Sequence, residues 1–98
     1  MTEKEKENRN SGRLRVGDKP FVNYVTSAKF QLKEVKEITI EARGKFISRA
    51  VDIAEVLRNK FLKDKVELVN VVIGSSQFKN KEGKDVTVSS IGITLKNK

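Results

Sequence analysis

The chain has 98 residues and a net charge of +8, because 21 Lys and Arg outnumber 13 Asp and Glu and no histidine is present. This length suits one domain with a modest core. No apolar run approaches the roughly 20 residues of a membrane span, no segment resembles a signal peptide, and no cysteine is available for a disulfide. We expect an intracellular protein without a membrane partner.

The first 12 residues carry balanced charges and no apolar pattern, so we expect them to form a disordered tail. The whole net charge of +8 then belongs to the predicted domain, residues 13–98. A basic domain suggests nucleic acid or another anionic surface as its partner. Charge that serves only solubility is the alternative.

Four strands and two helices are predicted in chain order. A short strand over 13–16 precedes a helix that begins near Pro20, with apolar residues at helical spacing as far as Leu32. Alternating residues predict a strand over 36–42, and the apolar pattern of 46–61 predicts a second helix. Two further strands are expected over 66–78 and 85–96, joined by the polar turn 80–84.

The order βαβαββ predicts an α/β fold of the α+β two-layer sandwich type. Right-handed crossovers place both helices on one face of a four-stranded mixed sheet. The apolar positions of the last strand change phase between Val88 and Ile91, so a bulge or bend is expected in it. The outer ends of the last two strands are therefore expected to project as an arm.

The helix over 46–61 has more apolar surface than one sheet can cover, since packing on a sheet needs a stripe only about 100° wide or somewhat wider. The excess predicts a second partner, most simply another copy of the chain. A central helix with neighbours on two sides is the alternative. The apolar residues are Phe46, Ile47, Ala50, Val51, Ile53, Ala54, Val56, Leu57 and Phe61.

Arg43 and Lys45 flank Gly44 where a predicted strand passes into this helix. Free amides and the helix dipole at such a position favour a phosphate group. Lys19 follows the first strand, and the carboxyl ends of the first two parallel strands share one edge of the sheet. We therefore expect Lys19 to lie near the other two cations and to form one phosphate-binding surface with them.

A second basic cluster lies at the turn between the last two strands. A two-stranded arm with a basic tip suits a groove of DNA, although lysines also protect sheet edges against aggregation. No set of base-reading side chains lies on one helix, so phosphate and shape contacts are expected instead of sequence readout. The cluster consists of Lys79, Lys81 and Lys84.

Catalytic chemistry has little support in the sequence. Histidine, cysteine and a phosphate-binding Gly-Lys loop are absent, and the carboxylates are dispersed among basic residues. Asp52 and Glu55 share one side of a predicted helix, where a solvated surface explains them better than an acid–base pair. We expect no enzymatic activity and no metal or other cofactor.

Several segments resemble those of the archaeal Alba chromatin proteins. Residues 17–25 are similar to the family's GKKPVMNYV, and residues 42–52 to its ARGRAISKAVD. Residues 58–61 and 88–91 resemble RNRF and VSTI. The similarity covers about 13–96, with the blocks in the same order.

The resemblance implies a homodimer whose fold is like the C-terminal domain of a bacterial translation initiation factor. It implies a cytoplasmic, chromosome-associated protein that coats and compacts duplex DNA with little sequence preference and often binds RNA. A protein directed mainly to RNA, acting in RNA processing or translation, is the alternative. The residues implied in backbone contacts are Lys19, Tyr24, Arg43, Gly44 and Lys45.

The same resemblance assigns the hairpin lysines to the minor groove. It assigns contacts between neighbouring dimers to Arg58, Asn59 and Phe61. One departure from the family is Asp18, which stands where Alba proteins have the first of two lysines. That lysine is the family's site of regulatory acetylation, so this control is in doubt here, and one phosphate contact is replaced by repulsion.

Overall fold

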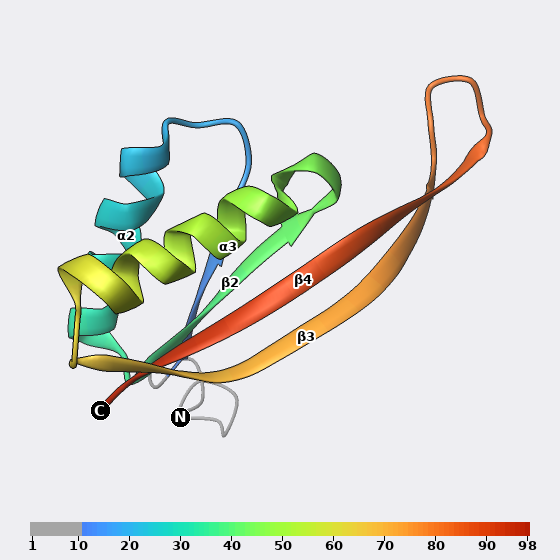
Figure 1. The fold of residues 1–98 in the computed structure, drawn as a ribbon. Coiled ribbons are helices and arrows are strands. Elements are labelled where there is room, and N and C mark those ends of the chain that lie inside the picture. The colour runs from blue at the N-terminus through green and yellow to red at the C-terminus, as the bar shows by residue number, and fades with distance from the viewer. Residues whose placement is uncertain (1–10) are drawn as a thin grey trace, which may run out of the picture.

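A computed structural model describes residues 11–98 of the chain (Figure 1). Four strands, two main helices and two short helical turns follow in the order of the sequence. Their bounds are β1 (Ser11–Arg15), α2 (Phe21–Glu34), β2 (Glu37–Arg43), η1 (Gly44–Phe46), α3 (Ile47–Val56), η2 (Leu57–Phe61), β3 (Val66–Lys79) and β4 (Asp85–Asn97).

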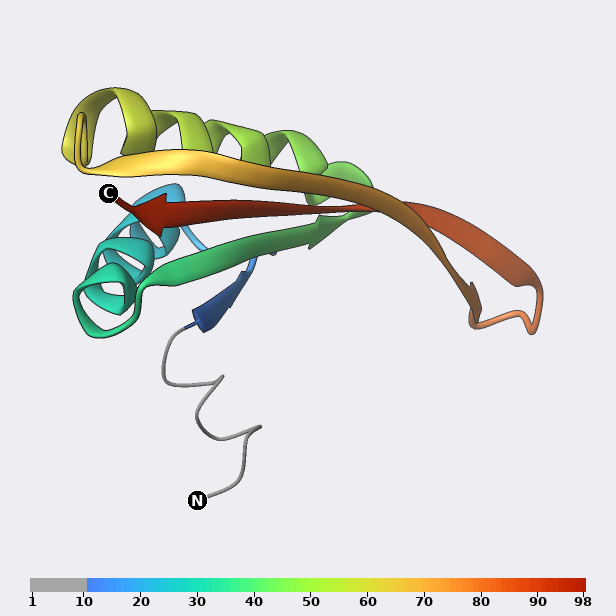
Figure 2. The ribbon, with the colours of Figure 1, turned by 90° about the horizontal axis from the view of Figure 1, so that it is seen from below.

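The four strands form one mixed sheet in the order β1-β2-β4-β3. β1 and β2 are parallel, whereas β4 is antiparallel to both β2 and β3. α2 and α3 lie on the same face of the sheet, and no helix of residues 11–98 lies on the opposite face (Figures 1 and 2). The predicted two-layer βαβαββ fold is confirmed.

The core lies between the helices and the sheet, where residues at helical spacing meet alternating residues of the strands. Each helix contributes one buried stripe, and the first helix ends at Glu34, shortly after Leu32, the last residue of its predicted stripe. Helix residues of the core are Tyr24, Val25, Ala28, Leu32, Ala50, Ile53, Ala54 and Leu57. Strand residues are Leu14, Ile38, Ile40, Ala42, Val66, Ile93 and Leu95, with Val16 from the loop after β1.

The predicted helix over 46–61 consists of three helical segments. It begins with the 3-10 turn η1, continues as α3 and ends in the π-helical turn η2. In η2 the amide of Leu62 donates to the carbonyl of Leu57 at 2.8 Å. This wider turn changes the direction of the last side chains, so Leu57 is buried whereas Phe61 is 52% exposed.

β3 and β4 pair along their whole length, and their outer ends extend beyond β2 as the expected arm (Figure 1). The bulge predicted in β4 lies instead in β3, where the register shifts between Leu68 and Asn70. β4 stays regular because it pairs on both sides, and a bulge in the edge strand disturbs only one ladder of hydrogen bonds. The two apolar phases of β4 point to opposite faces of the sheet.

The first strand begins earlier than predicted. Ser11 and Gly12, which we assigned to the tail, pair with Glu37 and Ile38 of β2. The rest of the predicted tail lies outside the described residues. No helix within residues 11–98 is long and apolar enough to cross a membrane.

Candidate nucleic-acid interface

The loop that carries Lys19 is fixed from two sides. The hydroxyl of Tyr24 accepts hydrogen bonds from the amides of Gly17 at 2.8 Å and Lys19 at 3.1 Å. The guanidinium Nη1 of Arg49, on α3, donates to the carbonyls of the same two residues at 2.9 and 2.8 Å. The exposed side chain of Lys19 therefore extends from a loop with a defined backbone.

Arg49 also joins the two basic loops that the sequence predicted to be neighbours. It belongs to the first turn of α3, directly after Arg43 and Lys45, and it binds the loop between β1 and α2. A further bond connects the ends of β1 and β2, from the amide of Val16 to the carbonyl of Glu41 at 2.8 Å. Lys19, Arg43 and Lys45 are exposed and form what we call the loop cluster.

Gly44 stands at the centre of the loop cluster with φ of +57°. This left-handed conformation favours glycine, and no atom of residues 11–98 lies within 4 Å of the position that a Cβ would take here. A ligand can therefore approach the backbone of η1 without a side chain in the way. Lys45 lies with its Nζ 5.3 Å from the centroid of the Phe46 ring, which orients its charge beside the aromatic face.

Tyr24 has a different place from the one expected. Its side chain is only 6% exposed, and its hydroxyl is occupied by two backbone amides. This burial argues against a direct phosphate contact. The structure gives Tyr24 the task of holding the loop that presents Lys19.

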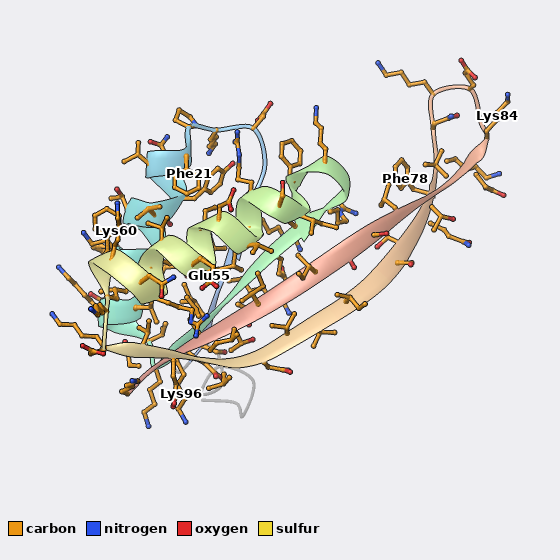
Figure 3. All side chains as sticks on the ribbon, in the orientation of Figure 1. Phe21, Glu55, Lys60, Phe78, Lys84 and Lys96 are labelled. Atoms are coloured by element: carbon orange, nitrogen blue, oxygen red, sulfur yellow. The ribbon has the colours of Figure 1, made fainter. Side chains whose placement is uncertain are left out.

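The arm ends in a turn ordered by Asn80. Its Oδ1 accepts from the amides of Glu82 and Lys84 at 2.9 and 3.0 Å, and Gly83 adopts φ of +80°. Lys84 lies at the tip of the arm, far from the helices (Figure 3). Lys81 is also exposed there.

Acidic residues reduce the positive charge of the arm. The Nζ of Lys79 lies 3.6 Å from Oδ1 of Asp85, and both side chains are largely exposed. Glu82 adds a second carboxylate to the turn. The structure therefore places more unopposed positive charge on the loop cluster than on the arm.

The three residues implied in contacts between dimers all lie in η2, at the end of α3 remote from the loop cluster. Phe61 is 52% exposed and lies under the Nζ of Lys29, which is 4.8 Å from the ring centroid. Arg58 donates to Glu55 at 2.8 Å, and Asn59 is exposed. Phe61 therefore belongs to the surface and not to the core.

The uncovered apolar surface lies mainly on β3, although the sequence indicated α3. Val71 and Ile73 pair with Ile93 and Ile91 and so point to the helix side, yet they are 49% and 78% exposed, because α3 packs on β2 and β4 and leaves this part of β3 uncovered. On α3, Val51 is 39% exposed. A hollow of about 420 Å³ between the start of α3 and the arm is lined by Ile47 and Ile73.

A family model of the Alba proteins matches residues 13–75 of the chain, which is well over half of it. The chain belongs to the Alba family. It is 50% identical over 82 residues to the DNA/RNA-binding protein Alba of Methanocella arvoryzae, covering 83% of this chain and 84% of that protein.

Solved Alba structures share the fold. Alba from Thermoplasma volcanium superposes with a TM-score of 0.77 at 38% identity, covering 86% of this chain and 98% of that one. ALBA1 from Trypanosoma brucei superposes with a TM-score of 0.65 at 23% identity, covering 91% and 69%. The second likeness is one of fold alone.

Arg49 is the principal residue of this surface that the sequence reasoning missed. It lies inside the segment 42–52 that resembles the Alba motif, and that position was the available signal. Its role depends on the distance between α3 and the loop after β1. That distance cannot be predicted from the pattern of neighbouring residues in the sequence.

Proposed function

We propose that this chain binds double-stranded DNA as a homodimer, largely without sequence preference, and coats and compacts chromosomal DNA in the cytoplasm. It also binds RNA and has no enzymatic activity. The printed name of the Methanocella relative, a DNA/RNA-binding protein, supports nucleic acid as the partner. The alternative is a protein that acts mainly on RNA in RNA processing or translation, and the same name supports it equally.

The observation that carries the proposal is the loop cluster. Lys19, Arg43 and Lys45 extend from two loops that Arg49 connects. Cations of this kind displace the counterions of a phosphate backbone, which supplies most of the affinity in binding without sequence preference. Gly44 has no side chain and open space beside its Cα, which leaves room for such a phosphate at this turn.

The exposed apolar strip of β3 supports the homodimer. Val71, Ile73 and Val51 lie on one side of the molecule and have no partner within residues 11–98 that covers them. A second copy packed here would bury this surface and place two loop clusters on one assembly. The arm lysines Lys79, Lys81 and Lys84 would then reach the minor groove.

Contacts between dimers along DNA are assigned to Arg58, Asn59 and Phe61. The half-exposed ring of Phe61 supports this assignment, because an aromatic side chain on the surface gains most when a partner covers it. The separation of η2 from the loop cluster leaves both surfaces free to act at once.

A competition experiment tests the proposal. Duplex DNA, duplex RNA and single-stranded RNA of equal length compete for the full chain at one salt concentration. The proposal predicts that duplex DNA competes at least as well as duplex RNA. Preference for either RNA by about tenfold or more would favour the alternative, and failure to bind any polymer would refute both.

A further inference from the structure

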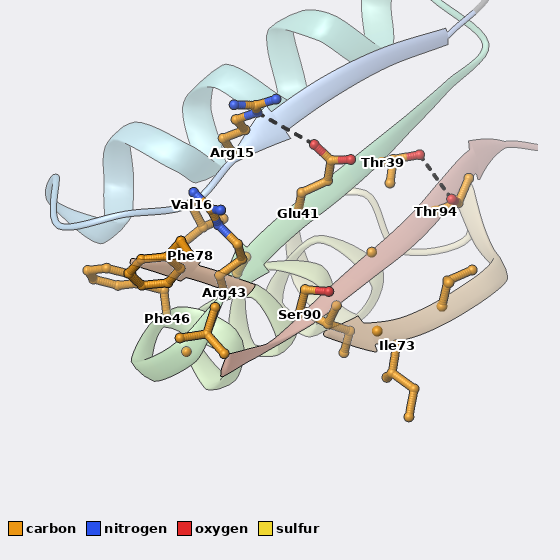
Figure 4. Close-up of a pocket in the computed structure, with 17 residues that line it drawn as sticks. Arg15, Val16, Thr39, Glu41, Arg43, Phe46, Ile73, Phe78, Ser90 and Thr94 are labelled. Atoms are coloured by element: carbon orange, nitrogen blue, oxygen red, sulfur yellow. Dashed lines mark hydrogen bonds and ion pairs between the residues drawn. The ribbon is translucent and has the colours of Figure 1, made fainter. Parts of the chain in front are cut away.

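The face of the sheet without helices contains a groove of about 940 Å³ (Figure 4). One row of paired residues crosses it from β1 to β3: Arg15 pairs with Glu41, Glu41 with Gly92, and Gly92 with Val72. This volume lies within the range of about 300–1,000 Å³ typical of ligand sites. This row lies on the opposite face of the sheet from the apolar strip of β3, although Ile73 of that strip also lines the groove.

Small side chains make the groove hollow. Gly92 and Gly74 lie on β4 and β3, with Ser90 paired to Gly74 between the strands. Phe46 and Phe78 line one end, where Arg43 is also found (Figure 4). Phe78 is 47% exposed, so much of its ring is free to contact a ligand.

Aromatic rings combined with cations favour nucleotides whose bases are unpaired. A base stacks on an aromatic face while arginine or lysine binds its phosphate. A duplex cannot use such a hollow in the same way, because its bases are already stacked on one another. The Nζ of Lys45, 5.3 Å from the centroid of the Phe46 ring, adds a second cation beside Arg43 near this end.

The polar residues of the groove favour RNA over DNA. The hydroxyls of Thr39 and Thr94 lie 3.0 Å apart, and Ser90 supplies another hydroxyl (Figure 4). Such groups both donate to and accept from the 2′-hydroxyl that only RNA has. Glu41 adds an acceptor for the amino groups of bases.

The ion pairs between Glu41 and the neighbouring arginines are weak, so these arginines are available to bind phosphate. Its carboxylate oxygens lie 4.0 Å from Nε of Arg13 and 3.8 Å from Nε of Arg15. These are long ion pairs at the surface, since the two arginine side chains are 71% and 80% exposed. A phosphate can therefore replace the carboxylate as the partner of Arg15.

We infer that this groove binds a single-stranded segment of RNA, with a base stacked on Phe78 and phosphates bound by Arg15 and Arg43. The inference rests on the proposed function only in requiring that the chain binds nucleic acid. It adds a second site, joined to the loop cluster through Arg43. A structured RNA could then bind the loop cluster through a duplex segment and the groove through an unpaired segment at the same time.

The test uses a 12-nucleotide single-stranded RNA with one 2-aminopurine, whose fluorescence falls when the base stacks. Phe78→Leu keeps apolar bulk without an aromatic face, and Phe78→Tyr keeps the face. We expect Phe78→Leu to weaken RNA binding by roughly tenfold and to lose the quenching, whereas Phe78→Tyr behaves as wild type. Phe30→Leu is the matched control, because Phe30 is 65% exposed on α2 and lies outside the groove.

A blunt DNA duplex separates this inference from the proposed function. Its affinity should change by less than about twofold in Phe78→Leu. Equal losses for RNA and duplex would overturn the groove assignment, as would unchanged RNA binding and quenching in a folded Phe78→Leu protein. Equal binding and quenching of single-stranded DNA would overturn the choice of RNA. A wild-type chain that binds no nucleic acid would contradict the proposed function itself.

Discussion

The two ends of α3 present different chemistry on the same helix. Its first turn carries Arg49, which fixes the loop of Lys19, and it follows directly on Arg43 and Lys45. Its last turn widens into η2 and presents the ring of Phe61. One end is suited to phosphates and the other to an apolar partner. Contacts with DNA and contacts between dimers should therefore respond separately to mutation.

The largest effect is expected from a substitution that separates the two protomers of the proposed dimer. Neither end of α3 then acts in a dimer. Ile73→Asp places a charge in the apolar strip of β3, where Ile73 is 78% exposed. We expect a monomer by light scattering. Duplex affinity should fall about 100-fold or more, because two linked sites bind far more tightly than one.

The control for this change is Val22→Asp, which adds the same charge at a residue that is 63% exposed on α2. It should remain a dimer with nearly unchanged affinity. A dimeric Ile73→Asp protein would exclude the β3 strip as the dimer interface.

The next effect concerns the beginning of α3 and the loop that it holds. Tyr24→Phe removes the acceptor of two backbone amides, which should cost about 1 kcal/mol or more. The melting temperature should fall by roughly 4–8 °C per kcal/mol. Duplex affinity should fall a few-fold, while its salt dependence stays constant because no charge is removed. Weaker binding at an unchanged melting temperature would show that the hydroxyl contacts phosphate directly.

Phe61→Ala tests the other end of α3. We expect a stable dimer whose titration of long DNA is less cooperative, with little change on a duplex that accommodates one dimer. Since the ring is half-exposed, the loss of stability should be well below the roughly 3–5 kcal/mol of a buried phenylalanine. Phe30→Ala, on α2, is the control and should retain cooperativity. A monomeric or strongly destabilised Phe61→Ala protein would refute the assignment.

Asp18→Lys should have the smallest effect. Asp18 is exposed beside Lys19, and within residues 11–98 no side chain caps the start of α2, so its carboxylate does not serve as a cap for that helix. Removing the repulsion should tighten duplex binding at low salt by roughly 1 kcal/mol or less per unit of charge. The gain should disappear at high salt. Weaker binding would show that the Asp18 carboxylate makes a contact on which the loop depends.

The sequence allowed most of the fold to be predicted, because helical stripes and alternating strands are local patterns. The stripe that includes Val25 and Leu32 is an example. The π-helical turn was missed because a helical wheel assumes 100° for every residue. The bulge was assigned to the wrong strand, because the phase change in β4 did not reveal which strand lies at the edge of the sheet.

The charged residues of the candidate site were predicted from the sequence, but the residues that hold its loops in place were not. Lys19, Arg43 and Lys45 were recognised from turns that need no long-range information. The role of Arg49 depends on contacts with residues 32 and 30 positions away in the sequence, and the role of Tyr24 depends on the path of one loop. The exposed strip of β3 was missed for the same reason, since only the packing of the helices decides which strand stays uncovered.

The central claim is that the loop cluster binds phosphates. It is tested by the slope of log K against log salt for a blunt duplex, compared between wild type and the double variant Arg43→Ala, Lys45→Ala. Each lost contact should flatten the slope by about 0.9, and a dimer loses four. The control Lys63→Ala, Lys65→Ala removes the same charge beyond the far end of α3 and should leave the slope unchanged. Equal slopes for wild type and a folded Arg43→Ala, Lys45→Ala protein would contradict the account.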